Sequence, residues 1–196
     1  MEKQGNSTFH GDRIAPHDAQ PLFDFTSSQP TDQSNLGDLI AYIEQTHHAF
    51  TRLQLSQITT LLDGLVDTAM PAFTEIRHCF AQLQADLIPH FMKEERILFP
   101  YIVELESNPA HKPHSCFGSI ANPIRMMGIE HEAMKNLLTT LRELMENYRP
   151  IATYAPNIKA LYAALSELDS DLIQHIQWED GVLFPRALTL DKEVLT

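Results

Sequence analysis

The stretch HFMKEERILFP at residues 90–100 returns, with changes, as HIQWEDGVLFP at residues 175–185. The two copies agree in a histidine, a glutamate four residues later, an acidic residue directly after that glutamate, and a final Leu-Phe-Pro. Residues four apart on an α-helix share one face and are separated by about 6 Å along the axis. Each copy therefore predicts a helix that presents a histidine and a glutamate on the same face.

Apolar residues recur at steps of three and four around both copies and in two further segments, which is typical of helices with one buried face. The predicted stripes of the first and second helices include Leu36, Ile40, Leu53, Ile58, Phe73, Leu83, Ile97 and Tyr101. Those of the third and fourth include Met127, Met134, Leu138, Leu161, Leu168 and Leu172. In the last three helices, histidines fall within the stripes and are predicted to point inward.

Helix-starting and helix-breaking residues divide these stripes into four segments. Asn35 is a candidate N-cap of the first helix, Pro71 and Pro123 open the second and third, and residues 108–122 form a loop. Four helices of about 25 to 35 residues with shorter connections predict an all-α fold, an antiparallel up-down four-helix bundle. The expected organisation is a flexible N-terminal arm over residues 1–33, the bundle over 34–190 and a C-terminal tail over 191–196.

The composition limits the classes of function. The formal charge of -12 comes from 26 acidic and 14 basic residues, and no Lys/Arg cluster forms the basic patch that nucleic-acid binding needs. No stretch approaches the roughly 18 consecutive apolar residues that cross a bilayer, and the N-terminus lacks the apolar core of a signal peptide. Cys79 and Cys116 are too few for a disulfide scaffold. We therefore expect a cytoplasmic protein with free thiols and without nucleic-acid or membrane partners.

Further histidines lie upstream of each copy of the repeat. The first predicted helix contains His47 and His48, and the third contains His131. An antiparallel bundle brings one first-helix histidine together with the inward groups of the other helices, which are His90, Glu94, His131, His175 and Glu179. Four imidazoles and two carboxylates are thus predicted to surround one internal point.

Such a buried polar set needs a partner. Each buried ionisable group without one costs several kcal/mol, whereas a whole domain is stable by only about 5 to 15 kcal/mol. No lysine or arginine lies beside these groups in the stripes, so ion pairs do not supply it. Two metal ions, each bound by two histidines and sharing both glutamates, coordinate all six groups. Mixed imidazole and carboxylate ligation with open positions is typical of non-haem iron, with manganese as an alternative, whereas zinc prefers closed sites or cysteine.

A different di-iron pattern also occurs in this sequence. Ferritin-like bundles use Glu-x-x-His pairs, and the chain has Glu44 with His47 and Glu75 with His78. His78 lies about 18 Å along its helix from His90. We therefore expect these residues at the surface or the edge of the bundle.

The motifs resemble those of the hemerythrin-like, or HHE cation-binding, family, and within it the RIC group, whose name stands for repair of iron centres. Besides the two repeats, the resemblance includes HHAFTR at 47–52 and NPIRMMGIEHE at 122–132. It implies a non-haem centre of two iron ions with an oxo-type bridge, two bridging glutamates and four terminal histidines. In this sequence these are Glu94, Glu179, His48, His90, His131 and His175.

The choice between the two first-helix histidines depends on this resemblance. Apolar spacing favours His47 as the inward residue, while the family pattern of a histidine followed four residues later by an arginine matches His48 and Arg52. We assign His48 as the ligand and expect His47 to be a surface residue. In RIC-like chains the glutamate before the third-helix histidine lies near the metals. Glu130 is accordingly a candidate hydrogen-bond acceptor or proton carrier, the alternative being a solvated charge.

Two departures from the family bear on the expected function. Oxygen-carrying hemerythrins have a fifth histidine where this chain has Lys135, and the RIC group shares the four-histidine arrangement. The N-terminal cysteine-containing domain usual in the RIC group is not expected in this chain. The resemblance implies a role in nitrosative and oxidative stress: supply of iron to damaged clusters of transient iron–sulfur partner proteins, reaction with nitric oxide or nitrite, or both. The alternative is binding, storage or sensing of O2 or NO without repair, and the sequence does not decide whether the protein is an enzyme.

Overall fold

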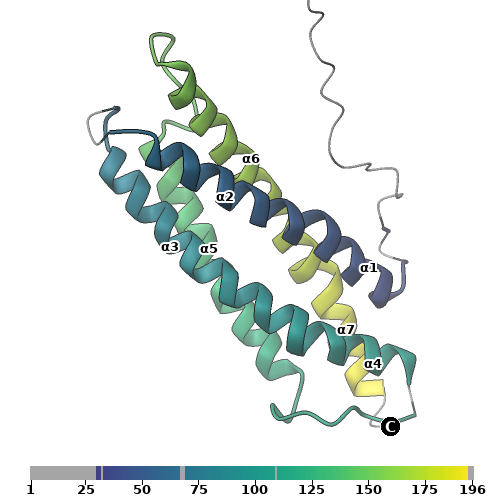
Figure 1. The fold of residues 1–196 in the computed structure, drawn as a ribbon. Helices are drawn as coiled ribbons and strands as arrows, with labels where there is room; N and C mark the ends of the chain where they lie inside the picture. The colour runs from purple at the N-terminus through teal and green to yellow at the C-terminus, as the bar shows by residue number, and fades with distance from the viewer. Residues whose placement is uncertain (1–29, 32, 67–68, 109, 194–196) are drawn as a thin grey trace, which may run out of the picture.

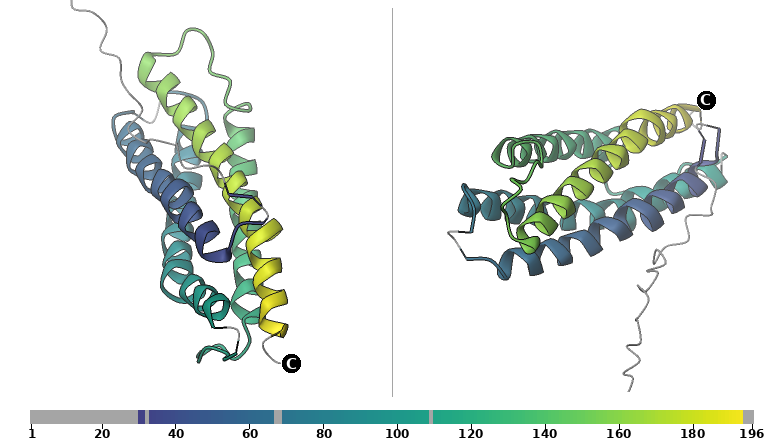
Figure 2. Two further views of the ribbon diagram at one scale, coloured as in Figure 1. Left: turned by 90° about the vertical axis from the view of Figure 1, so that its right-hand side faces the viewer. Right: turned by 90° about the horizontal axis from the view of Figure 1, so that it is seen from above.

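The computed structural model describes residues 30–31, 33–66, 69–108 and 110–193. Over these ranges the chain is helical and contains no strand, and four long rods lie alongside one another (Figures 1 and 2). The prediction of an all-α four-helix bundle is confirmed. The predicted N-terminal arm lies almost entirely outside the described residues. None of the described helices has the length and apolar character that a membrane span needs.

Three of the four rods contain a π-helical segment between α-helical segments. The first rod is α1 (Leu36–Tyr42), η1 (Ile43–His48) and α2 (Ala49–Asp63). The second is α3 (Phe73–Lys93), η2 (Glu94–Leu98) and α4 (Phe99–Ser107). The third is α5 (Ala121–Leu144) alone, and the fourth is α6 (Pro156–Trp178), η3 (Glu179–Leu183) and α7 (Phe184–Glu193). The first rod packs on the fourth through α2 and α6, and the second packs on the third through α3 and α5 (Figure 1).

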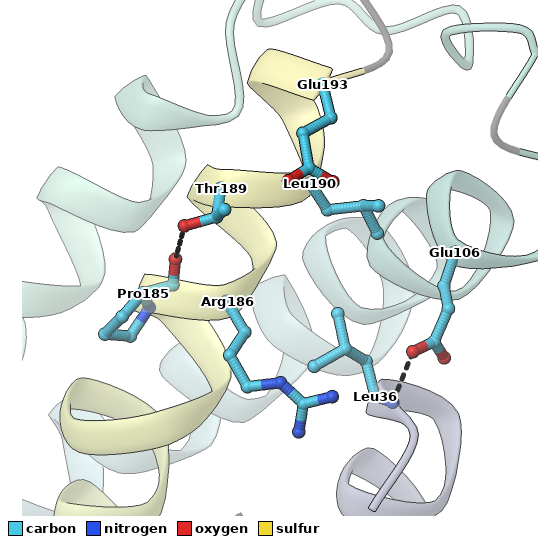
Figure 3. A pocket seen from close by; sticks show the side chains of 7 residues that line it. All are labelled: Leu36, Glu106, Pro185, Arg186, Thr189, Leu190 and Glu193. Carbon is cyan, nitrogen blue, oxygen red and sulfur yellow. Dashed lines mark hydrogen bonds between the residues drawn. The ribbon is translucent and has the colours of Figure 1, made fainter. Parts of the chain in front are cut away.

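The start of the first rod is fixed by side chains. Asn35 accepts a hydrogen bond from the backbone N–H of Asp38 at 2.6 Å, which confirms the predicted N-cap. Glu106, near the end of α4, accepts a hydrogen bond from the backbone N–H of Leu36 at 2.7 Å (Figure 3). It also accepts one from the backbone N–H of Gly37 at 3.0 Å. These are donors that a helix leaves unsatisfied at its N-terminus, where a carboxylate is favoured. The first two rods are therefore held in register at this end.

The π-helical segments change which residues are buried. A π turn closes hydrogen bonds five residues apart and adds one residue to the turn, so the buried face moves by one position along the chain. The prediction that Ile97 lies in the core is wrong for this reason: Ile97 is 47% exposed, while Leu98 is 1% exposed. Leu53, which follows η1, is likewise exposed, whereas the next residue, Gln54, is buried.

The two ends of the bundle have separate apolar cores. One lies among α2, α3, α5 and α6, and the other joins α1, α4 and α7. At the second end, the buried Asp191 accepts hydrogen bonds from Tyr101 at 3.1 Å and Lys112 at 2.9 Å. Asp191 lies in helix α7, which ends at Glu193, three residues beyond the predicted end of the bundle. The layer between the two cores holds the π-helical segments and the buried polar groups.

Candidate metal centre

The structure brings together all six side chains assigned from the sequence. His48 ends η1, His90 lies in the last turn of α3 and His131 in the middle of α5. Glu94 and Glu179 are the first residues of η2 and η3, and His175 lies in the last turn of α6. All six are at most 1% exposed. Each His-x-x-x-Glu motif therefore spans the junction between an α-helix and a π-helical segment.

The six side chains form two histidine pairs linked by two carboxylates. The Nε2 atoms of His48 and His175 lie 3.2 Å apart, as do those of His90 and His131. Glu94 places Oε1 at 3.1 Å from His90 Nε2 and Oε2 at 3.5 Å from His48 Nε2. Glu179 likewise approaches one histidine of each pair. Two donor groups of four residues result, and both contain Glu94 and Glu179.

The same arrangement holds for the second carboxylate in detail. Glu179 Oε1 lies 3.0 Å from His175 Nε2, and Glu179 Oε2 lies 3.1 Å from His131 Nε2. Each glutamate thus offers one oxygen to each histidine pair. This is the arrangement of a carboxylate that bridges two ions.

The donor atoms fit metal ions better than they fit one another. All four carboxylate oxygens of Glu94 and Glu179 are buried, and none accepts a hydrogen bond within the described part of the chain. Two ligand atoms about 2.1 Å from one ion and at right angles lie about 3.0 Å apart, close to the distances between these nitrogens and oxygens. Leaving such groups unpaired costs several kcal/mol for each buried charge. The residues present therefore fit two ions that share both carboxylates.

Three of the four histidines are oriented by a carboxylate on the outer side of the ring. His48 Nδ1 pairs with Glu95, His90 Nδ1 with Glu130 and His131 Nδ1 with Asp180, each at 2.8 Å. Such outer partners fix the tautomer and the direction of a metal-binding imidazole, which leaves Nε2 facing inward. Glu130 therefore takes the position of a hydrogen-bond acceptor, one of the two roles expected from the sequence.

Two of these carboxylates, those of Glu95 and Asp180, were not singled out from the sequence. A signal for them was present, because both occupy the acidic position shared by the two copies of the repeat. Each supports the histidine of the preceding rod, so the acid of the second rod orients His48 and the acid of the fourth orients His131. The repeat therefore encodes a glutamate shared by both donor groups and, directly after it, the acid that pairs with a donor histidine on a neighbouring helix.

Basic side chains stand behind these outer carboxylates. Arg52 donates to both oxygens of Glu95 at 2.8 and 2.9 Å, and Lys135 lies 3.5 Å from Asp180. The hydrogen bond from His48 and the guanidinium of Arg52 lower the pKa of Glu95 to about 2 despite its partial burial. Glu95 is therefore charged at neutral pH and accepts a hydrogen bond from the protonated Nδ1 of His48.

Aromatic rings close the centre from both ends of the bundle. Phe99 stacks on His48 with centroids 5.9 Å apart, and Phe184 stacks on His131 with centroids 6.1 Å apart. Phe91 also lies on His48, at 4.0 Å. The phenylalanine of each Leu-Phe-Pro motif thus covers the same histidine that the acid of its own repeat orients. These rings cover the imidazoles of His48 and His131.

Without ions, the buried ligands hold protons unequally. Burial lowers the pKa of His48 to about 4. Burial acts in the same direction on His131, but its bond to Asp180 and the nearby Glu179 raise its pKa to about 10. Burial and the adjacent charge of Glu179 raise the pKa of Glu94. Ions that bind here must displace protons from His131 and Glu94, because metal ligands bind in their deprotonated forms.

The expectation that His47 is a surface residue is wrong. His47 is 2% exposed, because η1 turns both His47 and His48 toward the interior. Its Nδ1 pairs with Asp171 at 2.8 Å, and its ring is parallel to that of His175 with centroids 5.9 Å apart. His78, in contrast, is exposed as expected, and it belongs to neither donor group.

A four-helix bundle that turns four histidines and two shared glutamates into one buried layer is typical of a class of metal-binding proteins. A family model described as the hemerythrin HHE cation binding domain matches residues 38–187. The chain therefore belongs to the hemerythrin HHE cation-binding family, as the motifs indicated.

Curated relatives with this sequence pattern carry one common name. The iron-sulfur cluster repair protein YtfE of Edwardsiella ictaluri is 35% identical over 171 residues, which cover 84% of this chain and 72% of the relative. The protein of that name from Musicola paradisiaca is 34% identical over 179 residues, covering 90% and 74%. The Yersinia pestis protein is 32% identical over 165 residues, covering 83% and 70%.

Proposed function

We propose that the chain holds two iron ions through His48, His90, Glu94, His131, His175 and Glu179, with the two glutamates as bridges. The observation that carries this proposal is the pair of four-residue donor groups that share Glu94 and Glu179, whose four oxygens are buried without hydrogen-bond donors. Histidine and carboxylate ligands in this mixture are typical of non-haem iron. The similarity to proteins named for iron–sulfur cluster repair supports iron over manganese.

The function proposed for this centre is the supply of iron to damaged iron–sulfur clusters under nitrosative and oxidative stress. Six protein ligands shared by two ions leave coordination positions open for small ligands such as nitric oxide, nitrite or O2. Lys135, at the place of the fifth histidine of oxygen carriers, is bound to Glu132 at 2.8 Å and lies close to Asp180. It therefore adds no ligand, which favours ions that react and leave over ions that are permanently guarded.

The protein partners of this function are transient ones, namely iron–sulfur cluster proteins that have lost iron. Relatives that match most of this chain bear the name of a repair protein, and this similarity supports the choice over storage or sensing of O2 or NO. The cell compartment proposed is the cytoplasm, where reduced iron and cluster enzymes meet.

The proposal is tested by iron transfer to an iron–sulfur enzyme. The iron-loaded protein is mixed with the apo form of a [4Fe–4S] hydratase, sulfide and a reductant, and the recovery of hydratase activity is followed. We expect recovery in proportion to the iron lost from the loaded chain, and none with Glu94→Leu, which lacks a bridging carboxylate. Tightly held iron that shows a reversible spectral change with O2 or NO and restores no activity contradicts repair and favours storage or sensing.

A further inference from the structure

The two helix hairpins surround the centre with matching residues at most positions. His48, Arg52 and Glu95 of the first hairpin correspond to His131, Lys135 and Asp180 of the second, in equivalent contacts. One pair of equivalent positions differs between the hairpins. The residue directly before His48 is His47, whereas the residue directly before His131 is Glu130.

This difference leaves one ligand without support. Glu130 accepts from His90 Nδ1 at 2.8 Å and is itself paired with Lys93. His47 instead gives its Nδ1 to Asp171, and its Nε2 has no hydrogen-bond partner. The Nδ1 of His175, buried beside His47, also has no partner. His175 is therefore the one ligand histidine of the four that no carboxylate orients.

The two ions of the proposed centre are consequently held unequally. Loss of an outer hydrogen-bond partner of a metal-binding histidine typically costs 10- to 100-fold in metal affinity. Both histidines of the His90 and His131 pair have such partners, whereas only His48 has one in the other pair. The subsite of His48 and His175 is the weaker one.

A polar seam leads away from this weaker subsite between the first and fourth rods. It consists of His47, Thr51, Gln54 and Asp171, each of which has a buried side-chain atom without a hydrogen-bond partner. The amide of Gln54 donates to the exposed Glu167 at 3.2 Å, at the outer end of the seam. Asp171, with 17% of its side chain exposed, lies between this end and His175. Buried polar groups of this kind are normally satisfied by water or by a cation.

The matching interface between the second and third rods is closed. The positions of Thr51 and Gln54 are taken there by Met134, which is buried, and Leu137, which packs on the apolar core. A surface hollow beside Pro89 exists on this side, but the ammonium of Lys93 is already bound to Glu130 in its wall. Among the described residues, no comparable row of unpaired polar atoms lies beside His90 and His131.

We propose that the ion held by His48 and His175 is the exchangeable one, and that the seam of His47, Thr51, Gln54 and Asp171 is its path to solvent. The inference rests on the proposed di-iron centre and names the subsite from which iron is delivered. In the described part of the chain, Asp171 forms an ion pair with His47 alone, so its carboxylate is available to a passing cation.

The test is the kinetics of iron release from the full chain loaded with ferrous iron. Under anaerobic conditions the loaded protein is mixed with an excess of a chromogenic ferrous chelator, and absorbance is followed. We expect two phases of one iron per chain each, the first at least about 10-fold faster than the second. Asp171→Asn keeps the hydrogen bond to His47 but removes the charge, and we expect the fast phase to slow about fivefold.

The fold supplies a matched control at Asp86, which holds the same place relative to His90 as Asp171 holds relative to His175. Asp86 is partly exposed and accepts a hydrogen bond from Gln82 at 2.9 Å. Asp86→Asn removes one charge of the same kind from the other half of the bundle, and we expect both phases to be unchanged. A second variant, Glu130→Gln, is expected to accelerate the slow phase alone by about 10-fold.

Two results overturn the inference. One is release of both ions in a single phase by the wild-type chain. The other is an equal effect of Asp171→Asn and Asp86→Asn on the fast phase. In both cases the chain still binds two irons and the proposed centre stands. A wild-type chain that binds fewer than two irons contradicts the proposed centre itself, and the inference is then wrong together with it.

Discussion

The hairpin of the first two rods and the hairpin of the last two build the same centre from matching parts. Each supplies a histidine from its first rod, a histidine and a glutamate shared by both donor groups from its second, an acid after the glutamate and a stacking phenylalanine. The halves differ in the residue before the first-rod ligand, which is a histidine in one and a glutamate in the other. The ligands thus obey the two-fold arrangement, while the residues behind them are free to make the two subsites unequal.

The largest effect is expected from replacing one of the two glutamates proposed as bridges, because each belongs to both donor groups. Replacing Glu94 or Glu179 by leucine removes one oxygen from each donor group, so neither ion keeps its full ligand set. We expect the iron content to fall from two per chain to less than one in both variants. Metal analysis checks this, with circular dichroism as the control for folding. A variant that retains two irons contradicts the assignment of that glutamate as a bridge.

The next largest effect is expected from replacing the phenylalanines that stack on His48 and His131, one in each hairpin. Phe99→Ala and Phe184→Ala each remove a buried ring that covers a ligand histidine. A buried phenylalanine cut to alanine typically costs about 3 to 5 kcal/mol of unfolding free energy. We expect losses in this range and of similar size for both variants, measured by urea unfolding of the metal-free chain. A loss confined to one variant shows that the two rings are not equivalent.

Neutralising the outer acids is expected to have a smaller effect. Glu95→Gln and Asp180→Asn retain a hydrogen-bond acceptor for His48 and His131 but lose the charge. We expect each to weaken the binding of one ion about 10-fold, near the lower limit for such partners, while the second ion is bound as before. Competitive titration with a ferrous chelator measures both affinities. Equal weakening of both ions by either variant contradicts the division into two subsites.

The two halves are also expected to respond to pH in opposite directions. His131 of the metal-free chain has a pKa raised to about 10, so its stabilisation is complete below about pH 6.5 and is lost as the pH rises toward 10. His48 has a pKa lowered to about 4, so its contribution is complete above about pH 6.5 and is lost as the pH falls toward 4.

Urea unfolding of the chelator-treated chain between pH 4 and 10 checks this prediction. We expect His131→Gln to flatten the alkaline side of the stability profile and His48→Gln to flatten the acidic side. Identical profiles for the two variants contradict the opposite protonation states of these matched histidines.

The bundle and the inward direction of five of the six donors could be predicted from the sequence because a four-residue spacing and a 3.6-residue period specify one helix face. The sixth donor, His48, was assigned from the family pattern. The structure groups these residues as the repeat indicated. The π-helical segments could not be predicted, since an added residue in a turn leaves no mark in an apolar stripe. That is why Ile97 was expected in the core, whereas the structure exposes it. His47 was placed at the surface because the family pattern selected His48, although the apolar spacing had favoured His47 as the inward residue, and η1 buries both.

The outer partners show a second limit. The sequence shows an acidic residue at the same position of both repeats, Glu95 and Asp180. The helical pattern alone does not predict which residue of a neighbouring helix such a side chain contacts. Glu95 contacts His48, and Asp171 contacts His47, across interfaces that only the packing of the rods defines. The unsupported Nδ1 of His175 was invisible for the same reason, because it depends on a residue of the first rod.

The pair of ions is tested by metal analysis of the purified full chain, combined with Mössbauer spectroscopy after growth on ⁵⁷Fe. We expect two irons per chain in a magnetically coupled pair, with two distinguishable environments in the ferrous state. One zinc per chain and no iron, or two irons without magnetic coupling, contradicts a centre in which Glu94 and Glu179 bridge a pair of iron ions.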